Sequence, residues 1–442
     1  EKGTGKGYMP GTKNRARLMA VREPMGGDGI QLVWSEDRLA GFVDPAGRVV
    51  EITHNREGHV SEIRLIRSPK GDCNIFLAGY EYTADGRLAS HIDRNKNRRR
   101  YAYDSKGRLI KETDRNGYSF HFHYDDLNRC VRTYGDDNSY WVELDYMGSM
   151  TKATDGLGGV TTYAYDENFR VTATVDAEGG VTTREYSEEG WLAKLTDANG
   201  NATETAYDEG GRVVEVVDPN GNKTAYEYNE AGHPVGLIDP GGNEWRMTRD
   251  ARGLLSTSTT PSGRTRTFER DESGRVTAVV EADGETWRRT WSAAGLVLCD
   301  TRADGVRTEY ACDETGAVTT QIEISRESEK RELKIKRDAE GRVTAIDGPS
   351  GRRERFELLP EGQPTKLTVG TRTAKRRYEG WGRMVEHTDP LGRATKVEYD
   401  PHHYVTAVYL PGKRSWQYIR DGLGRTTRMV TPDKVNVSYV YD

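Results

Sequence analysis

The stretch Val213-Val-Glu-Val-Val-Asp-Pro-Asn-Gly-Asn-Lys-Thr-Ala-Tyr-Glu-Tyr228 decides the fold of this chain. Its first five residues are β-branched or extended, which is typical of a short strand. Asp218-Pro-Asn-Gly-Asn222 is a predicted turn, because proline fixes φ and Asn-Gly supplies the left-handed backbone positions that a hairpin needs. The last six residues form a second strand, with Tyr226 and Tyr228 on one face. After a further turn at Asn229-Glu-Ala-Gly232 the pattern starts again.

This unit of two strands and two turns returns about every twenty-one residues. We call the residue just before the turn that starts at Asn229 in this copy the marker; it is most often tyrosine. The turn that follows the marker is the first turn of a unit, and the turn that starts at Asp218 in this copy is an example of the second turn. The markers are Tyr82, Tyr103, Tyr124, Leu144, Tyr165, Tyr186, Tyr207, Tyr228, Arg249, Arg270, Trp291, Cys312, Arg337, Leu358, Tyr378, Tyr399, Arg420 and Tyr441. Degenerate copies at His54 and Trp34 bring the total to roughly twenty units. Such regularity predicts an all-β fold, a continuous antiparallel ribbon, and argues against a catalytic domain with unique loops.

Glycine recurs four and fourteen residues after the marker, where tight turns require positive φ. An aspartate comes just before the second turn of many units. Because acid catalysis does not need so many copies, we expect these aspartates to accept hydrogen bonds within the turn. They are Asp114, Asp155, Asp176, Asp197, Asp218, Asp239 and Asp389.

The composition is 34% apolar and 31% charged, which is too polar for a large central core. We therefore expect a thin sheet that is wet on both faces and is held by its backbone ladder and cross-strand pairs. About forty strands spaced by about 4.8 Å give a ribbon roughly 190 Å long, which would curl into a ring on the order of 60 Å across. One such turn does not close a container, so a longer parent protein is expected.

Residues 1–30 are rich in Gly and Lys and lack the repeat, so we interpret them as a lead-in or linker, with the repeat region at 31–442. The chain begins at Glu1 and stops inside a motif at Asp442, which suggests a fragment. It contains no apolar run long enough for a membrane span and no targeting signal. A net charge of −5 gives no reason to expect nucleic acid as a partner.

Two segments lengthen the period. About seven extra residues lie around Ser68–Cys73, and four more fall within Ile322–Ile335, where a longer hairpin is expected. That hairpin is either a simple insertion or a docking element. The four cysteines do not form a disulfide pattern, and Cys130 and Cys312 replace apolar or marker residues of other copies.

No catalytic, cofactor-binding or metal-binding residue is assigned, and we expect the chain not to be an enzyme. The pairs His121/His123 and His402/His403 have no evident third ligand. Gly3-Thr-Gly-Lys-Gly7 lacks the Ser or Thr of a phosphate loop. Turns such as Asp197-Ala-Asn-Gly-Asn201 place their glycine wrongly for an EF-hand calcium site. A carbohydrate-acting enzyme would need a paired carboxylate site, and no pair stands out among the repeated acids.

Three copies of the motif carry a family resemblance: Tyr101-Ala-Tyr-Asp-Ser-Lys-Gly-Arg-Leu109, Tyr163-Ala-Tyr-Asp166 and Tyr226-Glu-Tyr-Asn-Glu-Ala-Gly232. They resemble the YD repeats of the Rhs family. The resemblance implies a β-ribbon wound into a hollow, cocoon-like shell that encloses a C-terminal toxin domain. Related shells occur in the B and C components of insecticidal toxin complexes and in teneurins. Bacterial members are commonly polymorphic toxins, often delivered by type VI secretion and used in interbacterial competition.

The resemblance further implies a bacterial effector that is cytoplasmic before export. Its partners would be the enclosed toxin domain and the rest of the shell, with secretion-apparatus proteins, a chaperone and an immunity protein as further candidates. The Asp389-Pro-Leu-Gly392 stretch matches the family's autoproteolytic motif only superficially, so any protease or toxin activity is expected outside this chain. The alternative is a teneurin-like or wall-associated adhesion scaffold. It would make use of glycosylation sequons at Asn201, Asn222 and Asn436.

Overall fold

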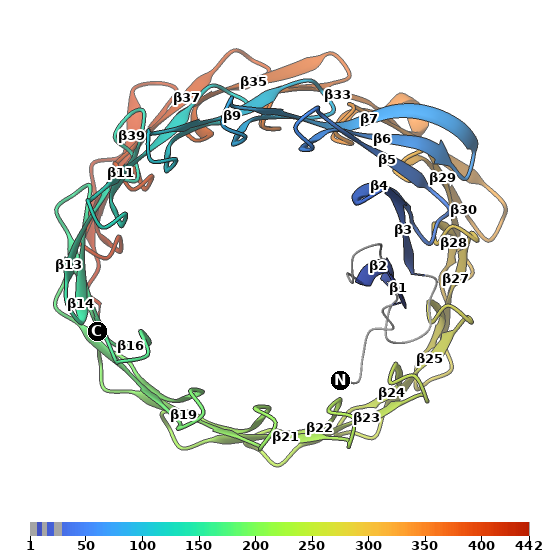
Figure 1. Cartoon of the computed structure of the whole chain (residues 1–442), viewed down its shortest axis with the longest axis horizontal. Coiled ribbons are helices and arrows are strands. Elements are labelled where there is room, and N and C mark those ends of the chain that lie inside the picture. The colour runs from blue at the N-terminus through green and yellow to red at the C-terminus, as the bar shows by residue number, and fades with distance from the viewer. Residues whose placement is uncertain (1–6, 11–15, 22–28, 442) are drawn as a thin grey trace. The chain divides into compact units, whose positions relative to one another are not determined.

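The computed structural model describes residues 7–10, 16–21 and 29–441. Within these ranges the chain forms a 41-stranded sheet, and the only helical element is the short 3-10 turn η1, Pro349–Gly351 (Figure 1). Consecutive strands pair antiparallel, as β19 does with β20 and β20 with β21. The prediction of an all-β antiparallel ribbon is therefore confirmed.

The chain divides into two compact units. Unit 1 is residues 1–98 and 226–354, and unit 2 is residues 99–225 and 355–442. In chain order, the first twenty strands are β1 Gly7–Pro10, β2 Ala16–Val21, β3 Ile30–Ser35, β4 Arg38–Val43, β5 Val49–His54, β6 Val60–Ser68, β7 Gly71–Tyr82, β8 Leu88–Ile92, β9 Arg98–Tyr103, β10 Leu109–Thr113, β11 Ser119–Tyr124, β12 Cys130–Gly135, β13 Val142–Met147, β14 Met150–Asp155, β15 Val160–Tyr165, β16 Val171–Val175, β17 Val181–Tyr186, β18 Leu192–Thr196, β19 Ala202–Tyr207 and β20 Val213–Val217.

The remaining strands are β21 Lys223–Tyr228, β22 Pro234–Ile238, β23 Glu244–Arg249, β24 Leu255–Thr259, β25 Thr265–Arg270, β26 Val276–Val280, β27 Thr286–Trp291, β28 Val297–Thr301, β29 Arg307–Cys312, β30 Val318–Ile324, β31 Lys330–Arg337, β32 Val343–Asp347, β33 Arg353–Leu358, β34 Pro364–Val369, β35 Arg372–Glu379, β36 Arg383–Thr388, β37 Ala394–Tyr399, β38 Val405–Leu410, β39 Arg414–Arg420, β40 Thr426–Val430 and β41 Asn436–Ser438. In the segment predicted to be a lead-in, β1 pairs with β2 and β2 with β3. The rest of that segment lies outside the described residues.

Both turns of the repeat share one geometry. In the second turn the Gly221 N–H donates to the Asp218 carbonyl at 2.9 Å, and the Asp218 carboxylate accepts from the Asn222 N–H at 2.9 Å. The first turn repeats this at Asp104, whose carboxylate accepts the Arg108 N–H at 2.9 Å. These bonds confirm the turn aspartates as structural acceptors. Only Gly221 is left-handed, with φ +83°; Asn220 is not, so the predicted Asn-Gly hairpin turn is corrected to a four-residue turn.

In most repeats the marker side chain ties its strand to the chain about fifteen residues earlier. The Tyr124 hydroxyl donates to the Leu109 carbonyl at 2.8 Å, and the Trp291 indole N–H donates to Val276 at 2.9 Å. Arginine makes the same bond, since the Arg270 guanidinium reaches the Leu255 carbonyl at 3.1 Å. Tyrosine, tryptophan and arginine are therefore interchangeable at this position because all three are long side chains with a terminal donor.

One marker was placed wrongly. Leu144 was predicted from spacing, but it is Tyr146 that donates to the Cys130 carbonyl, at 2.8 Å. Strands β13 and β14 are joined by the two-residue turn Gly148-Ser149, with Met147 opposite Met150. This turn is shorter than the four-residue turn of other copies, so the marker moves two residues along the strand.

The two faces of the sheet differ in exposure along some strands. Along β27, Arg288 and Thr290 are exposed, whereas Trp287, Arg289 and Trp291 are half-buried. Strand β23 alternates in the same way. Strands β18, β20 and β24 show no such alternation and are half-buried along their whole length. Among the described residues the buried apolar side chains are Val50, Leu65, Ala278, Ala345 and Ala407, so no large core forms.

Both lengthened periods form longer hairpins. Strands β6 and β7 meet at Pro69-Lys70, with Ser68 opposite Gly71. Strands β30 and β31 meet at a turn closed between Ser325 and Glu329, with Ile324 opposite Lys330. The expected long hairpin at 322–335 is confirmed, and whether it docks a partner stays a prediction.

Replacing Gly221 by valine should lower the free energy of unfolding by about 1 kcal/mol or more, because a β-branched residue is strained at positive φ. Nothing lies within 4 Å of a Cβ built at this glycine, so the effect isolates backbone strain from packing. Urea unfolding measures it. The matched control is Asn220→Ala, one residue earlier and outside the left-handed region, which should change stability by less than about 0.5 kcal/mol. Equal stability of Gly221→Val and wild type would refute the turn assignment.

Candidate functional site: turn seams and the Cys312 cavity

In unit 1, the second turn of the Tyr82 repeat is hydrogen-bonded to the first turn of the Arg337 repeat, which comes twelve repeats later in the chain. The Arg94 N–H donates to the Glu340 carboxylate at 2.6 Å. The Asn95 amide donates to Asp338 at 3.0 Å and accepts from the Ala339 N–H at 3.1 Å. We call such a turn-to-turn contact a seam. It covers Asp93, whose residual exposure is 1%.

Unit 2 contains an equivalent seam. The Arg115 N–H donates to the Glu361 carboxylate at 2.9 Å, and the Arg99 guanidinium reaches the same carboxylate at 3.0 Å. The Arg94–Glu340 and Arg115–Glu361 pairs have the same sequence separation, 246 residues. Burial by itself would raise the pKa of Glu361, but the Arg115 N–H and the charges of Arg99 and Arg115 outweigh it and lower this pKa. The seam thus holds an ionised carboxylate.

The unit 2 seam continues into a polar cluster. The Tyr118 hydroxyl lies 2.6 Å from both Asp137 and Ser139, and Arg383 forms an ion pair with Asp137. Burial raises the pKa of Tyr118 to about 12, aided by its bond to Asp137. Burial opposes ionisation of Asp137, yet the Ser139 and Tyr118 donors lower its pKa to about 2. Gly135 allows the Tyr118 hydroxyl to lie close to the backbone, because a Cβ at position 135 would be 1.7 Å from that hydroxyl.

The two histidine pairs make structural contacts. Pro401, just before His402, accepts the Tyr140 N–H through its carbonyl at 3.0 Å, and the His403 and Tyr140 rings lie 3.9 Å apart. His403 has φ +66°, at a turn position that other copies fill with glycine. Burial, and then the charge of Arg383, lower the pKa of His403, against the opposing effect of Asp137 and Asp400. The turn is therefore part of the seam.

The other pair, His121 and His123, flanks Tyr134 on the neighbouring strand. Both imidazoles stack on this ring at 5.1 and 5.5 Å. His121 also hydrogen-bonds to Asp136 at 2.8 Å, and His123 to the Tyr134 hydroxyl at 3.1 Å. In the part of the chain that the structure describes, no three metal-ligating side chains come together.

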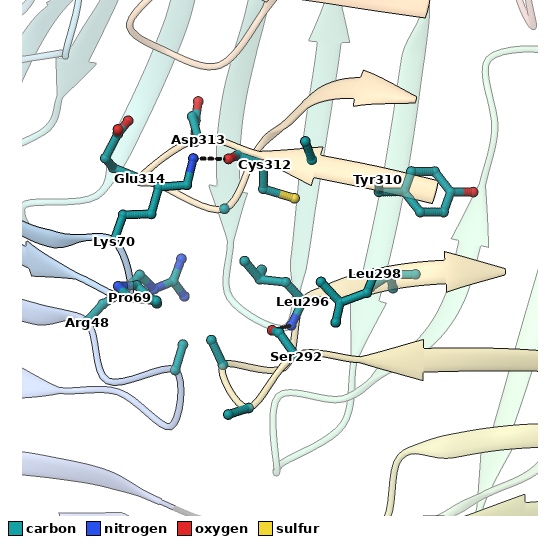
Figure 2. Close-up of a pocket in the computed structure, with 16 residues that line it drawn as sticks. Arg48, Pro69, Lys70, Ser292, Leu296, Leu298, Tyr310, Cys312, Asp313 and Glu314 are labelled. Atoms are coloured by element: carbon teal, nitrogen blue, oxygen red, sulfur yellow. Dashed lines mark hydrogen bonds between the residues drawn. The ribbon is translucent and has the colours of Figure 1, made fainter. Parts of the chain in front are cut away.

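A cavity of about 380 Å³ lies in unit 1 beside Cys312 (Figure 2). Its walls come from β28, β29 and their connecting turns, and from two hairpin turns near the start of the unit. Figure 2 shows the Cys312 thiol directed into the space next to Leu296 and Leu298. Arg48 and Lys70 form another wall. Burial, with Asp313 nearby, raises the pKa of the Cys312 thiol, so it is a poor nucleophile at neutral pH.

Sequence reasoning treated the first lengthened hairpin and Cys312 as unrelated irregularities. The structure brings them together, because the Lys70 ammonium at the hairpin tip donates to the Cys312 carbonyl. It also missed the seams. Their residues, such as Asn116 and Glu361, are ordinary turn residues whose meeting depends on a separation of 245 residues.

The sequence model described as RHS Repeat matches residues 82–118, 103–139, 150–181, 170–202, 186–223, 207–244, 249–286 and 378–414, which together cover just over half of the chain. The chain belongs to the RHS repeat family. A comparison with curated proteins finds no match. None of the helices within the described ranges is long and apolar enough to cross a membrane.

Solved structures share the fold of this RHS repeat chain. The crystal structure of TcdB2-TccC3 superposes with a TM-score of 0.60 at 13% identity, covering 97% of this chain and 31% of that one. The TcdB2-TccC3-TEV and TcdB2-TccC3-Cdc42 structures give TM-scores of 0.59 at 12% and 11% identity. They cover 97% of this chain and 32% and 33% of theirs. The predicted Rhs-type shell fold is thereby confirmed, and the chain spans about a third of the length of these structures.

Replacing Glu361 by alanine should lower the free energy of unfolding by about 1–3 kcal/mol, because the Arg115 N–H and two guanidinium groups lose their shared acceptor. Urea unfolding of this variant is compared with that of Glu209→Ala, an exposed turn glutamate of the same unit, which should stay within about 0.5 kcal/mol of wild type. Equal effects of the two changes would show that the seam contributes no stability.

The lowered pKa of His403 predicts acid-dependent loss of stability in unit 2. The folded state favours the neutral imidazole of His403. Its contribution to the free energy of unfolding is therefore complete above the pKa of the unfolded state, about 6.5, and is lost as the pH falls towards the pKa of the folded state. Asparagine tolerates the left-handed backbone and does not titrate. The free energy of unfolding should therefore decline less from pH 7 to pH 5 in His403→Asn than in wild type. Parallel pH profiles would contradict the prediction.

Proposed function

We propose that this chain is a wall segment of a toxin-encapsulating shell, whose parent protein encloses a C-terminal toxin domain. The observation that carries the proposal is the uninterrupted RHS ribbon. It matches TcdB2-TccC3 along 97% of its own length while covering only 31% of that chain. A wall segment needs continuity along the ribbon and attachment between its layers, and the strand ladder and the seams provide these within each unit.

The mechanism is sequestration. The exposed face carries charged and hydroxyl side chains, as along β27 and β23. On the half-buried face, many marker rings are covered by turn arginines, such as Arg108 lying 4.9 Å from the centre of the Tyr124 ring. Along β23 and β27, charged and hydroxyl side chains therefore interrupt the apolar surface. A passenger polypeptide held against such a wall is shielded without being tightly bound, because apolar burial is the main source of non-specific affinity.

The chain contributes architecture and no catalysis in this proposal. Its marker side chains and turn residues hold the wall, and the toxin and any autoprotease belong to other parts of the parent. The parent is a bacterial effector, delivered through a secretion system such as type VI. Its partners are the passenger, the rest of the shell and, during delivery, secretion and chaperone proteins.

An adhesion scaffold of the teneurin type is the second candidate from sequence, and the turn geometry favours it less. The Asn222 amide donates to the Asp218 carboxylate at 2.8 Å, and Asn201 donates to Asp197 at 2.9 Å. Two of the three sequon asparagines therefore serve their own turns, which accounts for their presence without glycosylation.

The test is to purify the full-length parent natively and to measure its intact mass and that of its cleavage products. A C-terminal domain that co-purifies with the shell and resists added protease, but is digested at once after denaturation, supports encapsulation. The control is the same domain expressed alone. Digestion of the domain at equal rates in both samples would refute the proposal, and a membrane anchor without a retained passenger would favour the adhesion scaffold.

A further inference from the structure

The marker ring normally occupies a defined place in the repeat. Its hydroxyl or indole N–H donates to the carbonyl about fifteen residues earlier, as Tyr186 does to Val171 at 2.9 Å. The turn arginine one residue before that carbonyl covers the ring, with the Arg170 guanidinium 4.8 Å from the Tyr186 ring centre. The same arrangement recurs at Tyr124 with Arg108 and at Tyr146 with Arg129.

At Cys312 both members of this arrangement are replaced. The marker is cysteine, and the residue in the place of the turn arginine is Leu296. Across the described part of the chain, no side chain donates to the carbonyl of Val297, fifteen residues before Cys312. Val297, Cys312 and Leu296 all line the 380 Å³ cavity. The cavity thus coincides with the place that a marker ring fills elsewhere, and it retains the carbonyl acceptor.

The surrounding walls suit an aromatic ring. Ala293, Leu296 and Ala311 contribute apolar surface, and the Arg48 and Lys70 side chains line the opposite side. The Arg48 guanidinium is held in place by a 2.8 Å bond to the Thr315 carbonyl. A cation beside a cavity of this kind interacts favourably with an aromatic face.

We propose that the Cys312 cavity is a binding site for a phenol-type ring, which takes the place of the missing marker side chain and donates its hydroxyl to the Val297 carbonyl. The apolar walls favour an uncharged ring, and the Val297 carbonyl favours a ring that carries a donor. This chemistry is shared by free small phenols and by the tyrosine side chain of a polypeptide. The proposal stands independently of the shell function, because it depends only on the local repeat geometry.

The test uses p-cresol, the side-chain analogue of tyrosine, titrated into the chain and followed by calorimetry and by NMR shifts of cavity residues. Its methyl ether, 4-methylanisole, keeps the ring and removes the donor. We expect p-cresol to bind about three- to tenfold more tightly than the ether, which corresponds to one hydrogen bond. Equal affinities, or no binding of p-cresol, would overturn the proposal.

The variant Cys312→Tyr should fill the cavity from within, raise the Tm and abolish p-cresol binding. Leu296→Trp narrows the same space from the opposite wall and provides a second test if the tyrosine variant folds poorly. The control is Cys299→Ala, a half-buried cysteine outside the cavity lining, which should bind p-cresol like wild type. Unchanged p-cresol affinity in folded Cys312→Tyr and Leu296→Trp would place the ligand elsewhere and refute the site.

N-acetyl-tyrosinamide and a tyrosine-containing peptide distinguish the two sources of the ring. If they compete with p-cresol and their phenylalanine counterparts compete less, the site accepts tyrosine from a polypeptide. If p-cresol binds and the amide and peptide do not, the site is limited to free phenols. Both results support a phenol site, and competition by phenylalanine equal to that by tyrosine would contradict it.

Discussion

A ribbon without a large hydrophobic core depends, in most of its repeats, on the bond from the marker side chain to a carbonyl about fifteen residues earlier. The strand ladder alone leaves two polar faces and gives little resistance to twisting or sliding of neighbouring hairpins. In most repeats the marker bond adds a fixed point, from Tyr124 to Leu109 or from Trp291 to Val276. The turn aspartate and arginine extend it, because Arg108 pairs with Asp104 and also covers the Tyr124 ring. Stability is thereby distributed along the ribbon instead of being concentrated in a centre.

The seams meet a different requirement. A ribbon ordered only by neighbouring repeats is free to bend, since each repeat contacts only the next ones along the chain. The seams add contacts over 246 residues and use backbone donors of one turn and carboxylates of another, such as Arg115 and Glu361. Charged acceptors form shorter and stronger hydrogen bonds than neutral ones. The same turn sequence therefore closes a hairpin in most repeats and joins two layers in a few.

Sequence periodicity predicted the strands, the turns and the role of the turn aspartates, because these depend on residues within about five positions of one another. It misplaced the marker at Leu144, because the Gly148-Ser149 turn shortens one hairpin without changing the spacing of the Asp residues. The seams and the Lys70–Cys312 contact were not predictable from spacing, because Asn116 or Lys70 has no local feature that marks its distant partner.

In a protein of repeated units, a specific site is most readily found where one unit departs from the rest. Most repeats satisfy this carbonyl with their own marker side chain, as Tyr186 does at Val171. The Cys312 unit keeps the acceptor at Val297 but lacks the donor and the ring, and the hairpin ending at Pro69-Lys70 encloses the vacancy without filling it. At Cys312 and Leu296 both the marker donor and the turn arginine are replaced, beside a lengthened hairpin, and the resulting cavity combines apolar walls with a few polar groups, which is the composition expected of a binding site.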